Sequence, residues 1–383
     1  MKRIIKILLY ILIINPLLLT SCWNYREADN LTLVRGLAID KAEDNNYLVS
    51  AETADMHEEG MEGKAKSVII ESKGETIFDA VRNAILVNVP RLYLGHTTVV
   101  VISQKLAQEG VTPVMDFLTR DHETRLDMHP VIYQGNEAKE IFKAKPFTAE
   151  IISEEIRDML YEQKRISKAV QVQIYEFMEC LASEGVSGIM PVVRLEEIAG
   201  EKVIRLCGTA VFKKDKLIGY LDEDETKYLC FVLDEVEGGV LTVNVGSKED
   251  NGKITLEILK SKTKVKPSYK EDKITIEIKI RIRAVLDEVR TRIKFNDQKD
   301  LDELAKIAGE QLKGHIENVI KKAQNSNSDI FGFGLQVKRS LPKVWKEKGK
   351  DWDKLFRELE VNIIPDIEIV HTGLLIKSVE VGE

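Results

Sequence analysis

The stretch "KITIEIKIRIRAVLDEV" (residues 273–289) is the clearest guide to the fold. Isoleucine stands at every second position from 274 to 282 and alternates with threonine, glutamate, lysine and arginine. Because successive side chains of a strand point to opposite faces, this alternation predicts a long antiparallel strand with one face buried and one in water. The stretch "KITLEILKSKTKVK" (253–266) is expected to pair with it. The last third of the chain therefore predicts a long-stranded antiparallel sheet.

A long helix is expected after this sheet, from about Leu301 to Ala323. Apolar residues recur there at helical spacing and are predicted to form its buried side: Leu304, Ile307, Ala308, Leu312, Ile316 and Val319. The "GFG" at 332–334 is interpreted as a glycine-permitted turn between helix and sheet. Beyond it, Trp345 and Trp352 are expected to anchor a core or an interface, among short helices that return to a final strand.

The first part of the chain predicts alternating strands and helices. Strand-like runs rich in valine, isoleucine and threonine cover 33–40, 46–54, 66–72, 96–103 and 127–134. Pro130 argues that the last of these is an edge strand, because proline has no N–H to donate to a ladder. A helix is expected over 104–119, and another is expected to carry on one face Ile77, Phe78, Val81, Ile85 and Leu86.

The middle of the chain predicts two helices within 147–183 and a β-hairpin within 205–226. The first helix is marked by Ile152, Ile156, Met159 and Leu160, and the second is expected to begin with Ser167 as its N-cap. The polar loop Lys213–Lys216 separates the two hairpin strands, and the acidic "DEDET" that follows suits the positive end of another helix.

These patterns predict a mixed α/β (α+β) protein with several domains. A content of 44% hydrophobic and 31% charged residues suits a globular chain, and its length exceeds what one ordinary core holds. We expect a signal peptide (1–21), an N-terminal α/β domain (22–145), a middle helical and hairpin domain (146–225), and a C-terminal domain of antiparallel sheet and helix (226–383).

The N-terminus predicts export and lipidation. Lys2, Arg3 and Lys6 precede an apolar run that ends in "LTSC" (19–22), which has the pattern of a lipobox. Cys22 would receive a diacylglyceryl group, and cleavage would leave it as the new N-terminus. Two acyl chains hold a protein stably on a membrane. The alternatives are a permanent transmembrane anchor and an ordinary signal peptide that ends by chance in cysteine.

Charge and cysteine content exclude several classes of protein. The chain has a formal net charge of −7, so it offers no electrostatic footprint for nucleic acid. Besides Cys22 it contains Cys180, Cys207 and Cys230, with no CxxC pair for a zinc ribbon or a redox site. Buried free thiols are the favoured interpretation of these three, and a single disulfide is the alternative.

Motifs of catalysis are absent from the sequence. It has no GxSxG, HExxH, GxxxxGK[ST] or GxGxxG, so we expect no enzyme and no cofactor. The polar stretch "TRDHETRLDMH" (119–129) suggests a metal through its acidic residues and histidines, but its spacing matches no metal template. We interpret it as a solvated, ion-paired helix end, and we predict no catalytic, cofactor-binding or metal-binding residue.

Several stretches together resemble one family, the Ger(x)C proteins, which are the C subunits of spore nutrient germinant receptors. They begin with "SCWNYREADNLTLVRGLAID" at the lipobox and continue through "LGHTTVVVIS", "FLTRDHETRLDMHPVI" and "GTAVFKKDKLIGYLDEDET". The last are "DIFGFGLQVKRSLPKVWKEKGKDWDKLF" and "EVNIIPDIEIVHTGLL". The chain departs slightly from the family pattern: Ser21 stands where glycine is common, and Asn24 where aspartate is common.

This resemblance implies a lipoprotein of three α/β domains, held on the outer face of the inner spore membrane. It would act with two multi-spanning partners, the A and B subunits, in a receptor whose response to nutrients starts germination. The resemblance implies no catalytic residue, so only Cys22 carries over as a functional position. The alternatives are a solute-binding lipoprotein of a transporter and an exported cell-wall hydrolase.

Overall fold

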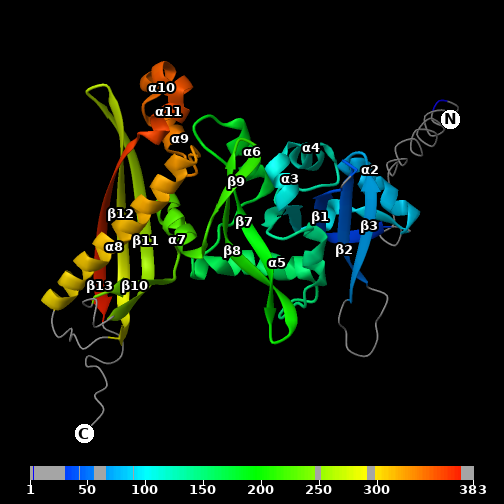
Figure 1. Cartoon of the computed structure of the whole chain (residues 1–383), viewed down its shortest axis with the longest axis horizontal. Helices are drawn as coiled ribbons and strands as arrows, with labels where there is room; N and C mark the ends of the chain where they lie inside the picture. The colour runs from blue at the N-terminus through cyan, green and yellow to red at the C-terminus, as the bar shows by residue number, and fades with distance from the viewer. Residues whose placement is uncertain are drawn as a thin grey trace, which may run out of the picture.

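The computed structural model describes Arg3 and residues 31–371, except 43, 56–65, 89, 246–251 and 291–297. The predicted signal peptide and Cys22 lie outside these described residues. The described part is elongated, with two β-sheets placed one after the other along the long axis (Figure 1). Within these ranges, no helix combines the length and the apolar composition that a membrane crossing requires. The predicted mixed α/β fold is confirmed.

The larger sheet has nine strands among the described residues, in the order β3-β2-β1-β5-β6-β7-β8-β9 with β4 beside β1. Their bounds are β1 Leu31–Lys41, β2 Tyr47–Asp55, β3 Lys66–Gly74, β4 Arg91–Tyr93, β5 Val99–Ser103, β6 His129–Tyr133, β7 Ile189–Ile198, β8 Glu201–Lys213 and β9 Lys216–Leu221. Strands β1, β5, β6 and β7 run parallel at the centre, and antiparallel pairs flank them on both sides. Parallel strands at such a centre are covered on both faces.

Helices cover both faces of this sheet. Val99 and Val101 of β5 pack into a cluster with α5 (Ile152–Glu162) and the 3-10 helix η4 (Ala138–Lys143). Val100 and Ile102 face the opposite core, whose helices are α2 (Ile77–Asn83), α3 (Gln104–Glu109), α4 (Thr112–Arg120) and α6 (Ile174–Ala182). This period-2 division of β5 explains why it reads as a continuous apolar run. The remaining 3-10 turns beside these helices are η2 (Ala84–Leu86), η3 (Leu94–His96) and η5 (Gln163–Arg165).

The prediction that Pro130 marks an edge strand is wrong, because β6 lies between β5 and β7. The N–H of His129 donates to the carbonyl of Thr98, on the β5 side, so the nitrogen of the next residue points the other way. On that side β7 pairs only with Ile132 and Tyr133. Pro130 therefore stands where no ladder bond from its nitrogen is required.

Two predicted helix boundaries differ from the structure. The helix expected over 104–119 is divided at Gly110, whose φ of 139° ends α3. Ser167 is not an N-cap, because its φ of 55° is left-handed and an N-cap residue is extended. Instead α6 begins after Gln173, which forms a capping box with Glu176.

Some residues predicted to be buried are exposed. Ile77 and Val81 of α2 are buried, whereas Phe78, Ile85 and Leu86 are exposed. The helical pattern fails for the last two because α2 ends at Asn83 and a 3-10 turn follows. In the later helix, Ile307 is likewise exposed, at 37%.

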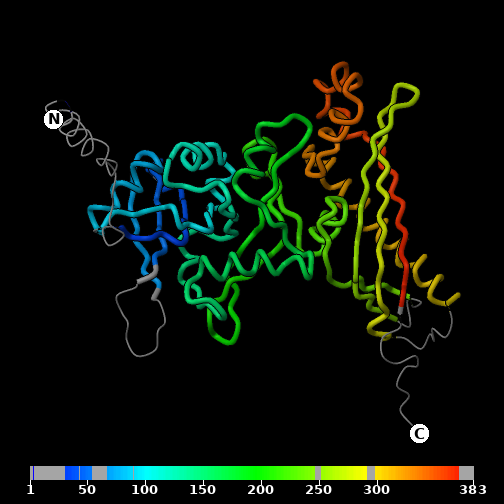
Figure 2. Tube along the Cα trace, turned by 180° about the vertical axis from the view of Figure 1, so that it is seen from behind, coloured from blue at the N-terminus to red at the C-terminus, as the bar shows by residue number. Residues whose placement is uncertain are grey.

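The second sheet has four strands among the described residues, in the order β10-β11-β12-β13. They are β10 Val240–Asn244, β11 Lys253–Lys270, β12 Lys273–Arg290 and β13 Glu360–His371. The predicted pairing of β11 with β12 is confirmed and is antiparallel, whereas β13 joins β12 in parallel. Helix α8 (Gln298–Asn325) lies across one face, and the opposite face of the sheet has no helix over it in the reverse view (Figures 1 and 2). The isoleucines of β12 at 276, 278, 280 and 282 are buried, as their alternation predicts.

The turn after α8 joins the two sheets. Helices α7 (Glu223–Leu233), α9 (Phe333–Ser340), α10 (Pro342–Lys348) and α11 (Trp352–Arg357), with η6 (Gly349–Asp351), lie around this junction. Buried Asp329 accepts hydrogen bonds from the N–H of Phe333 and of Gly334 and from the indole of Trp352. Burial raises the pKa of Asp329 to about 6. The turn predicted at 332–334 between helix and sheet is only partly correct. Gly332 has the expected left-handed φ of 67°, but Phe333 and Gly334 belong to α9, and the connection joins α8 to another helix. Trp345 and Trp352 are buried with ring centroids 5.5 Å apart, so their predicted role as anchors is confirmed.

The larger sheet contains strands from both sides of residue 145, and α7 spans residue 225. The division into domains 22–145, 146–225 and 226–383 stays a prediction.

Candidate functional site

A polar cavity of about 220 Å³ lies at the amino ends of β5 and β6, next to α5. Its walls come from β1, the segment before β5, the segment that leads into β6, and α5. The lining residues are Arg35, Gly95, His96, Thr97, Thr98, Arg125, Asp127, His129, Arg157 and Tyr161. The buried carboxylate of Glu52 and the half-buried ion pair of Arg35 with Glu154 connect the sheet to the first turn of α5.

Glu52 of β2 forms the buried part of this connection. It is fully buried, and its carboxylate accepts hydrogen bonds from the backbone N–H groups of Ile152 (3.0 Å) and Ser153 (2.7 Å). The hydroxyls of Ser153 and Ser67 donate to it as well. The first N–H groups of a helix have no partner within the helix, and a negative charge there is favoured by the helix dipole. Glu52 therefore fixes the start of α5 on the sheet.

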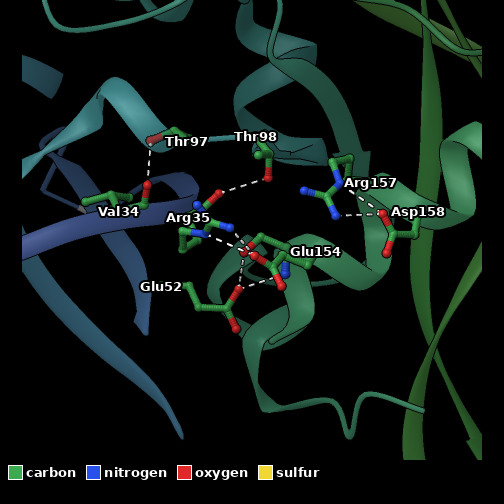
Figure 3. Close-up of polar contacts among 9 residues, drawn as sticks. Val34, Arg35, Glu52, Thr97, Thr98, Glu154, Arg157 and Asp158 are labelled. Carbon is green, nitrogen blue, oxygen red and sulfur yellow. Dashed lines mark hydrogen bonds and ion pairs between the residues drawn. The ribbon is translucent and has the colours of Figure 1, made fainter. Parts of the chain in front are cut away.

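Arg35 of β1 reaches the same turn from the cavity side. Its guanidinium forms a hydrogen-bonded ion pair with Glu154, with 3.1 Å between Nε and Oε1 (Figure 3). The next residue, Gly36, lies so close to α5 that a Cβ there would stand 2.7 Å from the Cβ of Ser153. Figure 3 shows Arg35, Glu52 and Glu154 converging at this first turn. The close approach of β1 to α5 thus requires glycine at position 36.

His129 is buried in the wall of the cavity. Its Nδ1 lies 3.0 Å from the carbonyl of Val172, and a carbonyl only accepts, so Nδ1 carries the proton. Burial lowers the pKa of His129, which keeps the ring neutral and leaves Nε2 as an acceptor. Within the described residues Nε2 has no hydrogen-bond partner. A buried acceptor of this kind is satisfied by water or by a small polar group that brings an O–H or N–H.

The charges around the cavity are already paired. Arg125 binds Asp127, and Arg157 binds Asp158, each through two hydrogen bonds. The hydroxyls of Thr97 and Thr98 donate to backbone carbonyls of β1, at 3.3 and 3.2 Å. The threonine hydroxyls therefore hold the segment before β5 against β1. Among the contacts of the described lining residues, none aligns a hydroxyl with a base as nucleophilic catalysis requires.

The polar stretch 119–129 forms ion pairs, as predicted, but it is less solvated than predicted. Glu123 pairs with Arg91, and both Asp121 and Glu123 are buried. His122 remains exposed, while His129 is buried in the cavity wall. In the part of the chain that the structure describes, no three histidine, cysteine or acidic residues gather as a metal site requires.

The three described cysteines are free thiols, in agreement with the favoured interpretation. Cys230 is buried, and Cys180 and Cys207 are half-buried. Burial raises the pKa of Cys180 and of Cys207 to about 11, so both thiols are protonated and weakly nucleophilic at neutral pH. Cys22, the one predicted site residue, lies outside the described residues.

Sequence reasoning missed Glu52, Arg35 and Gly36. The available indication was a lone glutamate within the apolar strand run "NYLVSAETA" (46–54), since a charge inside a covered strand needs a buried partner. Its partner lies about a hundred residues away, at the start of α5. No local pattern identifies such a pair.

Comparison with known proteins decides the family. The family model for the spore germination protein N-terminal domain matches residues 24–195 of the sequence. The family model for the spore germination B3/GerAC-like C-terminal domain matches residues 207–373. The chain belongs to the Ger(x)C family. The resemblance seen in the sequence is therefore confirmed for almost the whole described chain. This family consists of germinant receptor C subunits and is not known as a family of enzymes.

Relatives of this Ger(x)C protein match over nearly their full length. Spore germination protein KC of Bacillus subtilis (strain 168) is 25% identical, over 96% of each chain. Spore germination protein B3 of the same organism is 26% identical, over 93% of this chain and 95% of the relative. The crystal structure of the GerBC protein shares the fold with a TM-score of 0.56 and 22% identity, covering 88% of this chain and 98% of that one.

The alternative of a solute-binding lipoprotein is not favoured. It requires two similar α/β lobes around a cleft. The two sheets instead differ in strand order, in strand direction and in the helices that cover them.

Proposed function

We propose that this chain is the lipid-anchored C subunit of a nutrient germinant receptor in spores. Its role is assembly and signal transfer at the outer face of the inner spore membrane, together with the multi-spanning A and B subunits, and it catalyses no reaction. The observation that carries the proposal is the ordered match of both family domains across residues 24–373. The match begins two residues after Cys22, which agrees with a mature chain that starts at that cysteine.

A lipid on Cys22 gives this role a physical basis. A diacyl anchor confines the folded body to the membrane that holds the partners, and confinement raises their effective concentration without any new contact. The paired charges and backbone-bound hydroxyls around the cavity agree with a subunit that works by binding.

The first test is dipicolinate release from spores that lack this chain, measured across a panel of single nutrients. We expect the response to one nutrient class to be lost while the responses to others persist. A response unchanged for every nutrient, in a strain in which no other C subunit is present, would contradict the receptor role.

The second test is the substitution Cys22→Ala in the spore. We expect a chain that folds but is lost from the membrane fraction, with the nutrient response reduced to that of the deletion strain. Cys180→Ala is the matched control, because that thiol lies inside α6 and outside the lipobox. Normal germination of the Cys22→Ala strain would refute the anchor.

A further inference from the structure

The turn after α2 exposes three consecutive apolar side chains. Ile85, Leu86 and Val87 are 50%, 81% and 71% exposed, and we call them the apolar tip. Single exposed apolar residues are common on proteins, whereas contiguous ones mark contact surfaces. The preceding Ala84 is buried, so the turn is seated on the core and the three side chains protrude from it. On α2, which leads into the tip, Phe78 is also exposed, with the Arg82 guanidinium 4.5 Å above its ring.

Hydrogen bonds tie the apolar tip to the start of β1. The side chain of Asn88, the residue after the tip, donates to the hydroxyl of Thr32 (3.0 Å) and to the carbonyl of Pro90 (2.6 Å). The Thr32 hydroxyl donates to the same carbonyl. Strand β4 then pairs with the first residues of β1, Leu31 opposite Arg91. The tip therefore lies where the chain enters the folded body.

This position sets the distance between the tip and the proposed lipid. Cys22 precedes Leu31 by nine residues. An extended chain covers at most about 3.6 Å per residue, so the lipidated cysteine stays within about 30 Å of the start of β1. Whatever path residues 23–30 take, the anchor thus limits how far the start of β1, to which the tip is tied, can stand from the bilayer.

We propose that the apolar tip lies in the surface of the bilayer that holds the lipid of Cys22. This inference rests on the anchor in the proposed function. Aliphatic side chains that protrude, with no groove around them, suit the boundary between headgroups and acyl chains. Arg82, in the last turn of α2 before the tip, suits the phosphates of the same lipids. Because the anchor already confines the chain, a small apolar surface suffices for contact that it would not hold alone.

The contact fixes the orientation of the receptor subunit. Helix α2 and strand β3 lie at one end of the long axis, and the second sheet with α8 lies at the other (Figure 1). With both anchor and tip on the membrane, the end that carries α2 faces the lipid. The β10–β13 sheet then stands away from the bilayer surface.

Depth-dependent fluorescence tests the proposal. The lipidated full-length chain, with Trp23→Phe as background, is placed in phosphatidylethanolamine–phosphatidylglycerol vesicles with plain or brominated acyl chains. One variant carries Leu86→Trp, and the control carries Leu259→Trp, at an exposed leucine on β11 in the second sheet. We expect brominated lipid to reduce the fluorescence added at position 86 at least about twofold, because an indole there reaches the membrane interface. The fluorescence added at position 259 should not change.

Equal quenching at both positions would overturn the proposal. The intact mass of the chain reports whether Cys22 carries the diacylglyceryl group. A lipidated chain without quenching at position 86 refutes membrane contact by the tip and leaves the anchor standing, whereas a chain without lipid refutes both the anchor and the contact.

Amide hydrogen exchange of the lipidated chain without substitutions checks that tryptophan itself does not create the contact. We expect exchange at residues 84–88 to slow on vesicles, and exchange at 258–260 to stay the same. Unchanged exchange at 84–88 counts against the tip.

Discussion

At the scale of single residues, His129 makes the stability of the fold depend on pH. Burial lowers its pKa from the ordinary 6.5, so below pH 6.5 the unfolded chain binds a proton that the folded chain resists. Stability is complete above pH 6.5 and falls on acidification toward the lowered pKa, by at most about 1.4 kcal/mol per pH unit for one proton. In His129→Asn the amide nitrogen replaces Nδ1 as donor to Val172 and does not titrate. Urea unfolding between pH 7.5 and 5 should therefore show a smaller loss of stability in the variant. Parallel curves for both proteins would rule out this role of the histidine.

At the scale of elements, the attachment of α5 depends on Glu52. In Glu52→Gln the side chain keeps its shape, but its NH₂ group faces the N–H donors of Ile152 and Ser153. We expect a loss of about 1–3 kcal/mol in the free energy of unfolding, measured from the urea midpoint at unchanged slope. Glu71→Gln on the neighbouring strand β3 is the control, because that carboxylate is exposed and pairs with Lys139 on the surface of η4. An equal loss in both variants would mean that Glu52 acts only as a surface charge.

Prediction from sequence worked where an element's pattern is local. The alternation along β12 and the hairpin around Lys213–Lys216 each lie within one short segment, and the structure confirms both. The lipobox at Cys22 is equally local and stays a prediction. Prediction failed where a distant segment decides the outcome. Pro130 is tolerated at the centre of a sheet because its nitrogen points to a place where β7 forms no ladder bond with it. The partners of Glu52 come from the first turn of α5. Exposure of Leu86 depends on where α2 ends, which periodicity does not reveal.

At the scale of the whole molecule, the two sheets are joined through closely packed backbone. The N–H of Leu335 donates to the carbonyl of Gly185 (3.0 Å), and that of Ser187 to the carbonyl of Asp329 (2.8 Å). A Cβ at Gly334 would lie 2.5 Å from the Cα of Gly185 and 2.6 Å from the indole nitrogen of Trp352.

The substitution Gly334→Ala therefore tests whether the two sheets unfold as one unit. The added methyl group meets backbone that cannot move aside, and such overpacking costs about 1–3 kcal/mol. Because Trp345 and Trp352 lie at the junction, we expect their fluorescence to change at lower urea concentration than the far-UV circular dichroism, while the two transitions coincide in the unsubstituted chain. Gly314→Ala in α8 is the matched control. It has open space for a Cβ, and alanine favours the helix by up to about 1 kcal/mol, so this variant should be at least as stable as the unsubstituted chain. Coincident transitions in Gly334→Ala at an unchanged midpoint would mean that the junction tolerates a side chain, and rigid coupling through Gly185 would then be excluded.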